Sequence, residues 1–277
     1  MSQARGTWSL IRKGRLAGYG LKEESVTDFN LLELVRSAGS HIRVFPFTRA
    51  REGANGADWE WWLTGSSGSW LGYRVQAKII DASGSEYRHL HYLPKSKVSQ
   101  TDTLISRALS EPVPLIPLYC LYSNWDVAAH SAPWHCRRVS RSQMLLGCAV
   151  ISPFRVRSLR AGNQRSLAAV SPFMRPWHCL VCCGGAAASG AEDLPLRSGR
   201  YWASTIGAED AEILPENDEQ IPDDLIETYR ELGTPVVEPP GYVEAARAGK
   251  LDALADRNIA GIVVLDARDE GNLGGQT

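Results

Sequence analysis

Four polar residues on two neighbouring predicted strands have the types and spacing of a metal-dependent active site. Asp58 and Glu60 lie two residues apart, and so do Gln76 and Lys78. Because successive side chains of a strand point to opposite faces, each pair shares a face. The turn-rich residues 64–69 join the strands into a predicted hairpin. Carboxylate and amide oxygens can hold Mg²⁺ or Mn²⁺, and a lysine beside the ion can orient water or stabilise phosphate charge. This set indicates metal-assisted phosphodiester cleavage.

The elements expected around these residues follow the order helix, three strands, helix, strand. Apolar residues at helical spacing predict an amphipathic helix over residues 23–37 and another over residues 100–109. Apolar and alternating runs predict the strands, which span residues 41–47, 58–63, 70–80 and 115–122. Helices next to a sheet in this order predict an α/β fold with a central mixed sheet.

Alternation also divides the hairpin into two faces. Arg74 lies on the face of Gln76 and Lys78, and the residues between them are apolar, so one face of this strand is expected to lie on the core. Trp59 and Trp61 alternate with the acids and are expected in the core. Trp62 shares the acid face and is a candidate for substrate contact.

With these elements around them, Gly56-Ala57-Asp58 and Val75-Gln76-Ala77-Lys78 resemble the PD-(D/E)xK restriction-endonuclease-like nuclease superfamily, in its QxK (Mrr-like) variant. The resemblance covers about residues 22–123 and implies a restriction-endonuclease-like core with a C-terminal α/β extension. It implies that Asp58 binds the metal, that Gln76 occupies the second ligand position and that Lys78 is the catalytic lysine. The strings GADWEWW and VQAK also resemble a bacterial family of unknown function, which adds no activity.

The same resemblance implies further site residues and partners. Glu24 matches an additional acid on the first helix, with Glu23 an equal candidate, and Gln100 matches a polar group on the second helix. Glu60 and Arg74 complete the candidate set, as a further acid and an accessory or substrate-binding residue. The implied substrate is DNA, in bacterial restriction or anti-phage defence, with self-association or a defence-complex partner. One alternative is that Asp58, Glu60 and Lys78 form salt bridges on a solvated sheet face and that Gln76 is incidental. Another is a catalytically inactive nuclease-fold scaffold.

Cysteine and histidine form a second candidate set. Cys179 and Cys182 have CxxC spacing, and three further zinc-ligand types are His135, Cys136 and His178. Residues 177–183 (WHCLVCC) are predicted as a buried strand, in which alternation sends Cys179 and Cys182 to opposite faces. Buried free cysteines are therefore favoured over zinc. A non-catalytic, zinc-containing nucleic-acid-binding or interaction protein remains the alternative function.

Charge is strongly segregated in the 277 residues, although the net charge is −1. Residues 201–277 hold 5 Lys and Arg against 17 Asp and Glu, whereas residues 1–200 hold 25 against 14. A basic body with an acidic C-terminal part suits a polyanion-binding region joined to a part that does not touch the polyanion. Seven arginines between positions 137 and 165 are candidates for phosphate contacts, with surface solvation as the alternative.

The N-terminal residues lack the apolar core of a signal peptide, and no apolar run is long enough to span a bilayer, so a cytoplasmic protein with no membrane partner is expected.

The sequence predicts four regions. They are a flexible arm (1–21), the nuclease-like core (22–123), a basic Cys/His/Arg-containing continuation (124–205) and an acidic region with a disordered tail (206–277).

Overall fold

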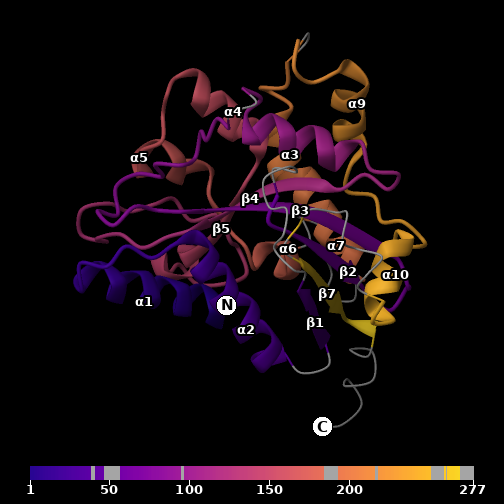
Figure 1. The fold of residues 1–277 in the computed structure, drawn as a ribbon, viewed down its shortest axis with the longest axis horizontal. Coiled ribbons are helices and arrows are strands. Elements are labelled where there is room, and N and C mark those ends of the chain that lie inside the picture. Colours follow the sequence, from indigo (N-terminus) through magenta and orange to yellow (C-terminus); the bar gives the residue numbers. More distant parts are fainter. Residues whose placement is uncertain are drawn as a thin grey trace.

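A seven-stranded mixed sheet forms the centre of the protein (Figure 1). The computed structural model describes residues 1–38, 41–46, 57–94, 97–183, 193–215, 218–250, 259 and 261–268. The strands are β1 (Ile42–Pro46), β2 (Trp59–Thr64), β3 (Trp70–Ile79), β4 (Ile116–Tyr122), β5 (Cys148–Ile151), β6 (Arg175–Pro176) and β7 (Gly261–Asp266). Their order across the sheet is β1-β7-β2-β3-β4-β5-β6. The predicted α/β class with a central mixed sheet is confirmed.

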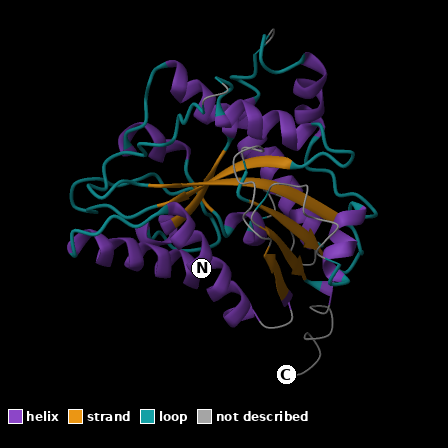
Figure 2. Cartoon of the chain, in the orientation of Figure 1, coloured by secondary structure: helices purple, strands orange, loops and turns teal. Residues whose placement is uncertain are grey.

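Helices cover both faces of the sheet (Figure 2). They are α1 (Ser2–Leu16), α2 (Glu23–Ala38), α3 (Gln100–Leu109), α4 (Pro153–Ala161), α5 (Leu167–Val170), α6 (Cys179–Cys182), α7 (Leu194–Tyr201), α8 (Ala208–Asp210), α9 (Asp223–Glu231) and α10 (Gly241–Arg247). In Figure 1, α3, α4 and α9 lie above the sheet, and α1 and α2 lie below it. No helix in the described ranges has both the length and the apolar character needed to cross a bilayer.

The bounds of β2, β3 and α3 agree with the prediction within one residue at each end. Strand β2 pairs antiparallel with β3, with Glu60 opposite Arg74. Helix α3 begins after Ser99, whose side chain accepts a hydrogen bond from the Asp102 backbone N–H and so caps the helix. The chain then returns in β4, parallel to β3. This strand–helix–strand unit brings the first turn of α3 beside β3.

Both faces of β3 are buried, which differs from the prediction. Arg74, Gln76 and Lys78 are at most 4% exposed, although they form the polar face. Helix α3 packs on that face, where the Arg74 guanidinium donates to the Arg107 carbonyl at 2.8 Å. Burial of charged and amide groups is tolerated because they bond to one another. The polar residues therefore lie in the interior and not on a solvated sheet face.

The N-terminal residues form a packed helix, so the predicted flexible arm over residues 1–21 is wrong. Helix α1 buries Ala4, Thr7, Trp8 and Ile11, which lie on one side because they are spaced by three or four residues. Gly147 allows close packing, because a Cβ there would lie 2.0 Å from the Ala4 carbonyl oxygen.

The strand β7, near the C-terminal end of the sequence, lies inside the sheet, between β1 and β2. Strand β7 pairs antiparallel with β1 and parallel with β2. Its backbone therefore bonds to strands from the opposite end of the chain, and the predicted boundary at residue 206 does not separate two structural units of the sheet. The predicted disordered tail falls on residues 269–277, outside the described residues.

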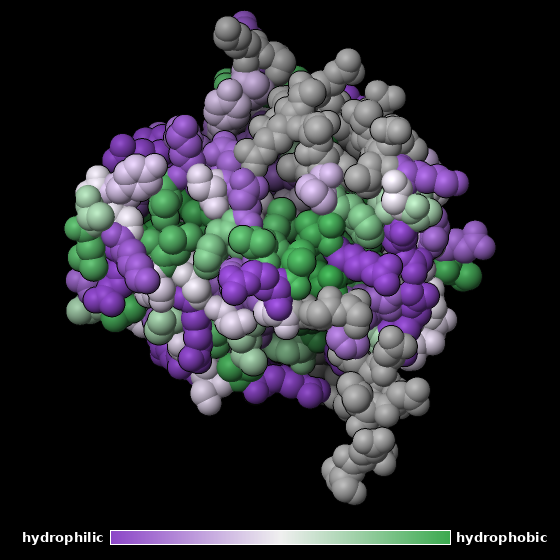
Figure 3. Space-filling view, turned by 60° about the horizontal axis from the view of Figure 1, so that its bottom comes forward, coloured by the Kyte–Doolittle hydropathy of each residue, from purple (hydrophilic) through white to green (hydrophobic). Residues whose placement is uncertain are grey.

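Residues 177–183 form a helical turn and not the predicted strand. The backbone N–H of Cys182 donates to the His178 carbonyl at 2.9 Å, and that of Cys183 donates to the Cys179 carbonyl at 3.0 Å. Below the sheet, an apolar cavity of about 320 Å³ lies near this turn, lined by residues that include Ile42, Trp61 and Val181. Figure 3 shows hydrophobic residues gathered across the centre of this side of the molecule.

Candidate metal-binding active site

Asp58 is held beside β3 at the point where β2 begins. Its backbone N–H donates to the Val75 carbonyl at 2.9 Å, and its Oδ2 accepts the backbone N–H of Ala77 at 2.6 Å. The carboxylate thus takes the place of a backbone partner just outside the ladder of β2 and β3. This double attachment fixes Asp58 next to Gln76 and Lys78.

Gln76 lies at the centre of the cluster. Its amide Nε2 donates to Asp58 Oδ2 at 2.6 Å and lies 3.5 Å from Glu23 Oε1. Its Oε1 accepts from Gln100 Nε2 at 2.7 Å. The Gln100 Oε1 is buried and accepts no hydrogen bond from any described residue. Five side chains from α2, the start of β2, β3 and α3 therefore converge: Glu23, Asp58, Gln76, Lys78 and Gln100.

Lys78 and Glu23 complete the charge pattern of this cluster. Lys78 Nζ lies 3.4 Å from Glu23 Oε1, and the two side chains are 5% and 20% exposed. Burial raises the pKa of Glu23 to about 7, the neighbouring Lys78 opposes this shift, and the Asp58 charge adds to it. The cluster holds two acids against one ammonium group, which favours an additional positive charge.

The structure selects between the two acids that begin α2. Glu23 and Glu24 both lie in the first turn of the helix, where negative charge is favourable. Glu23 reaches the cluster, whereas Glu24 is exposed. Adjacent residues of a helix point about 100° apart, so only one of them can face β3. Glu23, left as an equal candidate by the sequence, is the acid that the structure brings to the site in place of Glu24.

Comparison with known proteins gives a family and no activity. A family model described as a family of unknown function, DUF6615, matches residues 1–271. The chain belongs to the DUF6615 family. No curated protein and no solved structure matches it.

In this DUF6615 chain, Glu60 lies on the same face of the hairpin as Arg74, as predicted. Its hydrogen bonds and ion pair form a network separate from the Asp58 cluster. Arg74 Nη2 donates to Glu60 Oε1 at 2.7 Å, and the two side chains are 1% and 0% exposed. The other carboxylate oxygen of Glu60 accepts from Tyr242 at 2.7 Å and from Trp62 Nε1 at 3.3 Å. Glu60, Arg74 and Trp62 thereby join the hairpin to α10, and Arg74 also pairs with Glu111 at 2.8 Å. These contacts place the three residues in a buried ion pair and its support, apart from the Asp58 cluster.

Most of the arginines predicted to contact phosphate make contacts within the DUF6615 fold instead. Arg157 and Arg160 both pair with Asp102 on α3, and Arg157 also pairs with Asp218. Arg165 pairs with Glu86 at 3.3 Å. The first three ion pairs connect α4 to α3 and to the acidic part of the chain, and the last connects the segment after α4 to the segment between β3 and α3. The sequence contains these arginines and their acidic partners, but no local pattern in it indicates that they form ion pairs.

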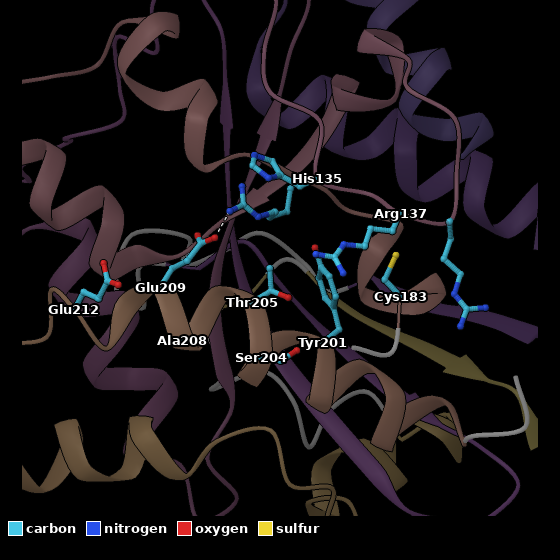
Figure 4. A pocket seen from close by; sticks show the side chains of 11 residues that line it. His135, Arg137, Cys183, Tyr201, Ser204, Thr205, Ala208, Glu209 and Glu212 are labelled. Carbon is cyan, nitrogen blue, oxygen red and sulfur yellow. Dashed lines mark hydrogen bonds and ion pairs between the residues drawn. The ribbon is translucent and has the colours of Figure 1, made fainter. Parts of the chain in front are cut away.

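A basic cavity of about 520 Å³ lies apart from the Asp58 cluster (Figure 4). Arg137, Arg138 and His135 line it, together with Tyr201 and Cys183. The cavity also contains an ion pair between Arg175 and Glu209. Burial and the nearby Arg175 lower the pKa of His135, so its imidazole is neutral at neutral pH. None of the five residues of the Asp58 cluster lines this cavity.

Proposed function

We propose that this protein is a metal-dependent nuclease that hydrolyses phosphodiester bonds of DNA. The observation that carries the proposal is the convergence of Asp58, Gln76 and Lys78 with Glu23, because this set provides metal ligands and an ammonium group at one place. Restriction or anti-phage defence in a bacterium is the biological role that the sequence resemblance suggests.

The residues present fit Mg²⁺ or Mn²⁺. Both ions prefer oxygen ligands, which Asp58, Glu23 and the Gln76 amide can provide. In the described structure the Gln76 amide N–H₂ lies between the two carboxylates, at 2.6 Å from Asp58 and 3.5 Å from Glu23. The partial positive charge of this N–H₂ group stabilises the two carboxylates at the position where a bound cation would also stabilise them. An amide presents either its nitrogen or its oxygen on rotation, and the unpaired Gln100 Oε1 offers an acceptor for the Gln76 amide N–H₂ if both amides rotate together.

The proposed hydrolysis depends on the positions of Lys78 on β3 and Glu23 on α2. A bound divalent ion would polarise the scissile phosphate and lower the pKa of an attacking water. Lys78, buried at the edge of the acidic pair, would orient this water or stabilise charge on the phosphate oxygens. In the metal-free protein Glu23 can hold a proton near neutral pH, because its pKa is about 7, and a bound cation would favour its ionised form. Asp58 stays fixed by the Ala77 backbone N–H throughout.

The order of elements supports the same proposal. Helix α2 is followed by β1, β2 and β3, then by α3 and β4, which is the order expected of a restriction-endonuclease-like core. The parallel pairing of β3 and β4 through α3 agrees with that core. The insertion of β7 between β1 and β2 would be a departure in which the C-terminal extension enters the sheet.

A cleavage assay tests the proposal directly. Supercoiled plasmid, linear duplex, single-stranded DNA and RNA are incubated with the protein and Mg²⁺ or Mn²⁺. We expect metal-dependent cleavage of DNA that falls by at least about 100-fold in Asp58→Asn and Lys78→Ala. Asn retains a hydrogen-bond acceptor for the Ala77 backbone N–H and changes the charge, so it separates chemistry from folding.

Matched controls come from the residues on either side of Glu23 in the sequence. Glu24→Gln and Lys22→Ala change an exposed acid and an exposed lysine beside Glu23, and both variants should cut as the parent does. Cleavage of RNA alone would contradict the assigned substrate. Equal cleavage by Asp58→Asn and the parent would show that the Asp58 cluster is not the active site.

A further inference from the structure

A second group of metal-ligating side chains lies outside the Asp58 cluster. Cys136, His178, Cys179 and Cys182 place one ligand atom each within 4.8 Å of all the others. Three of them come from the helical turn at α6, and Cys136 comes from the loop between β4 and β5. Cys182 lies four positions after His178 and three after Cys179 on the helical turn, so its side chain is a surface neighbour of both.

The two ring nitrogens of His178 point to a missing ligand, because both are buried without a hydrogen-bond partner among the described residues. The His178 side chain is 5% exposed. An imidazole carries one donor and one acceptor when neutral, and a buried polar atom without a partner destabilises the folded state. A metal bound to one ring nitrogen removes part of this cost.

The thiols provide the remaining three ligands. Cys136 and Cys179 are buried, and Cys182 is partly buried at the end of α6. Zinc binds thiolate sulfur at about 2.3 Å and imidazole nitrogen at about 2.0–2.1 Å in a tetrahedral arrangement. Such an ion holds its ligand atoms roughly 3.5–3.8 Å apart, so side-chain adjustments of about 1 Å suffice to close the observed cluster around it.

We propose that Cys136, His178, Cys179 and Cys182 bind one structural Zn²⁺ ion. Four protein ligands of this type leave no open position, which is typical of structural rather than catalytic zinc. Binding releases the thiol protons to solvent. The ion joins the loop after β4 to the turn after β6, two segments that lie 42 positions apart in sequence at Cys136 and His178.

Cys183 is the closest competing ligand. Its Sγ lies 3.1 Å from Cys182 Sγ and 3.6 Å from Cys136 Sγ. It also lines the basic cavity, and Figure 4 draws it beside Arg137 and Tyr201. We assign Cys182 to the metal because it lies one helical turn after His178, whereas Cys183 follows the end of α6.

The proposal is independent of the nuclease function, because the two clusters share no residue. The Cys136 cluster lies on the side of the sheet where Trp177 contacts Trp61, at 5.6 Å between ring centroids. The polar residues of the Asp58 cluster on β3 share a face with Glu60, opposite to Trp61. Metal content and nuclease activity can therefore fail separately.

Metal analysis of the full chain is the first measurement. Protein purified from zinc-supplemented medium and dialysed against metal-free buffer should retain about one zinc per chain by plasma mass spectrometry. Cobalt(II) in place of zinc should give the visible bands of a tetrahedral site and a thiolate-to-cobalt charge-transfer band in the near ultraviolet. Zinc below about 0.2 per chain, or an octahedral cobalt spectrum, would overturn the proposal.

Variants test the ligand set. Cys136→Ser, Cys182→Ser and His178→Ala should lower the zinc content at least about fivefold, whereas Cys183→Ser and the buried control Cys120→Ala should retain it. Asp58→Asn should also retain zinc. If Cys183→Ser loses the metal and Cys182→Ser keeps it, the assignment of Cys182 is wrong.

A disulfide is the competing explanation for thiols this close together. Thiol titration of the unfolded chain without reductant should find all six cysteines reduced. Two or more missing thiols that return with reductant, together with no bound zinc, would show that the cluster forms a disulfide and overturn the metal site. This readout uses the parent protein and does not depend on whether a variant folds.

Discussion

Replacement of Glu23 by Gln should stabilise the metal-free protein at neutral and higher pH while it removes metal-dependent cleavage. The buried carboxyl group of Glu23 has a pKa of about 7, against an ordinary 4.5, chiefly because burial disfavours the charged form. The folded state therefore binds this proton more tightly than the unfolded state. The free energy of unfolding of the parent should fall as pH rises from about 4.5 to about 7, because the native carboxyl group must then ionise at a cost.

The size of the effect follows from the shift in pKa. One unit of pKa corresponds to about 1.4 kcal/mol, so the Glu23 contribution to this fall is about 3 kcal/mol. The Gln side chain does not titrate. The difference in unfolding free energy between Glu23→Gln and the parent should therefore rise by about 3 kcal/mol between about pH 4 and about pH 8, and stay constant above that.

Urea unfolding at a series of pH values measures this difference, with protein dialysed against buffer without divalent cations. Glu24→Gln is the matched control, because it makes the same substitution at an exposed position of the same helical turn. Addition of Mg²⁺ should reduce the pH dependence of the parent and leave that of Glu23→Gln unchanged, because a bound cation favours the ionised carboxylate. Parallel curves for the parent and Glu23→Gln would refute the reasoning.

Four further results are expected. Gln76→Glu should strengthen Mg²⁺ binding at least about tenfold by isothermal titration calorimetry, because a carboxylate is a stronger ligand than an amide; unchanged affinity would place the ion elsewhere. Glu60→Gln should lower the free energy of unfolding by about 3 kcal/mol, because Arg74 loses its fully buried partner and keeps the partly exposed Glu111, whereas Glu60→Met combined with Arg74→Met should lose much less. Asp210 has a pKa of about 6, raised by burial, so its contribution to unfolding free energy should fall by about 3 kcal/mol as pH rises from about 4 to about 6, and a pH series on Asp210→Asn should lack this component. Zinc removal by a strong zinc chelator should lower the melting temperature by about 5–10 °C in calorimetry, and after removal of the chelator added zinc should restore it to the value of the untreated protein.

The amino-acid sequence predicted the elements of the Asp58 site because their signals are local. Alternation over residues 70–80 put Gln76 and Lys78 on one face, and β3 ends within one residue of the predicted strand. The prediction for α3 is correct at both ends, because Ser99 and the prolines after the helix act on neighbouring residues. The missed helix α1 also has a local signal, since Ala4, Thr7, Trp8 and Ile11 repeat at helical spacing.

Contacts between distant segments required the tertiary structure. The sequence left Glu23 and Glu24 equal, and only the position of α2 relative to β3 directs Glu23 to Lys78. The pairing of Glu60 with Arg74 depends on the register of two strands, and its closure by Tyr242 depends on where α10 packs. Strand β7 enters the sheet between β1 and β2, which no local pattern indicates.

The Cys136 cluster illustrates the physical reason. The run WHCLVCC is apolar enough to form a buried strand or a buried helical turn, and periodicity in so short a run does not separate the two. In the folded protein these residues form a helical turn beside the loop that carries Cys136. The turn places His178, Cys179 and Cys182 together. The sequence thus determined which side chains are available for chemistry and how neighbours alternate, whereas long-range packing decided which of them meet.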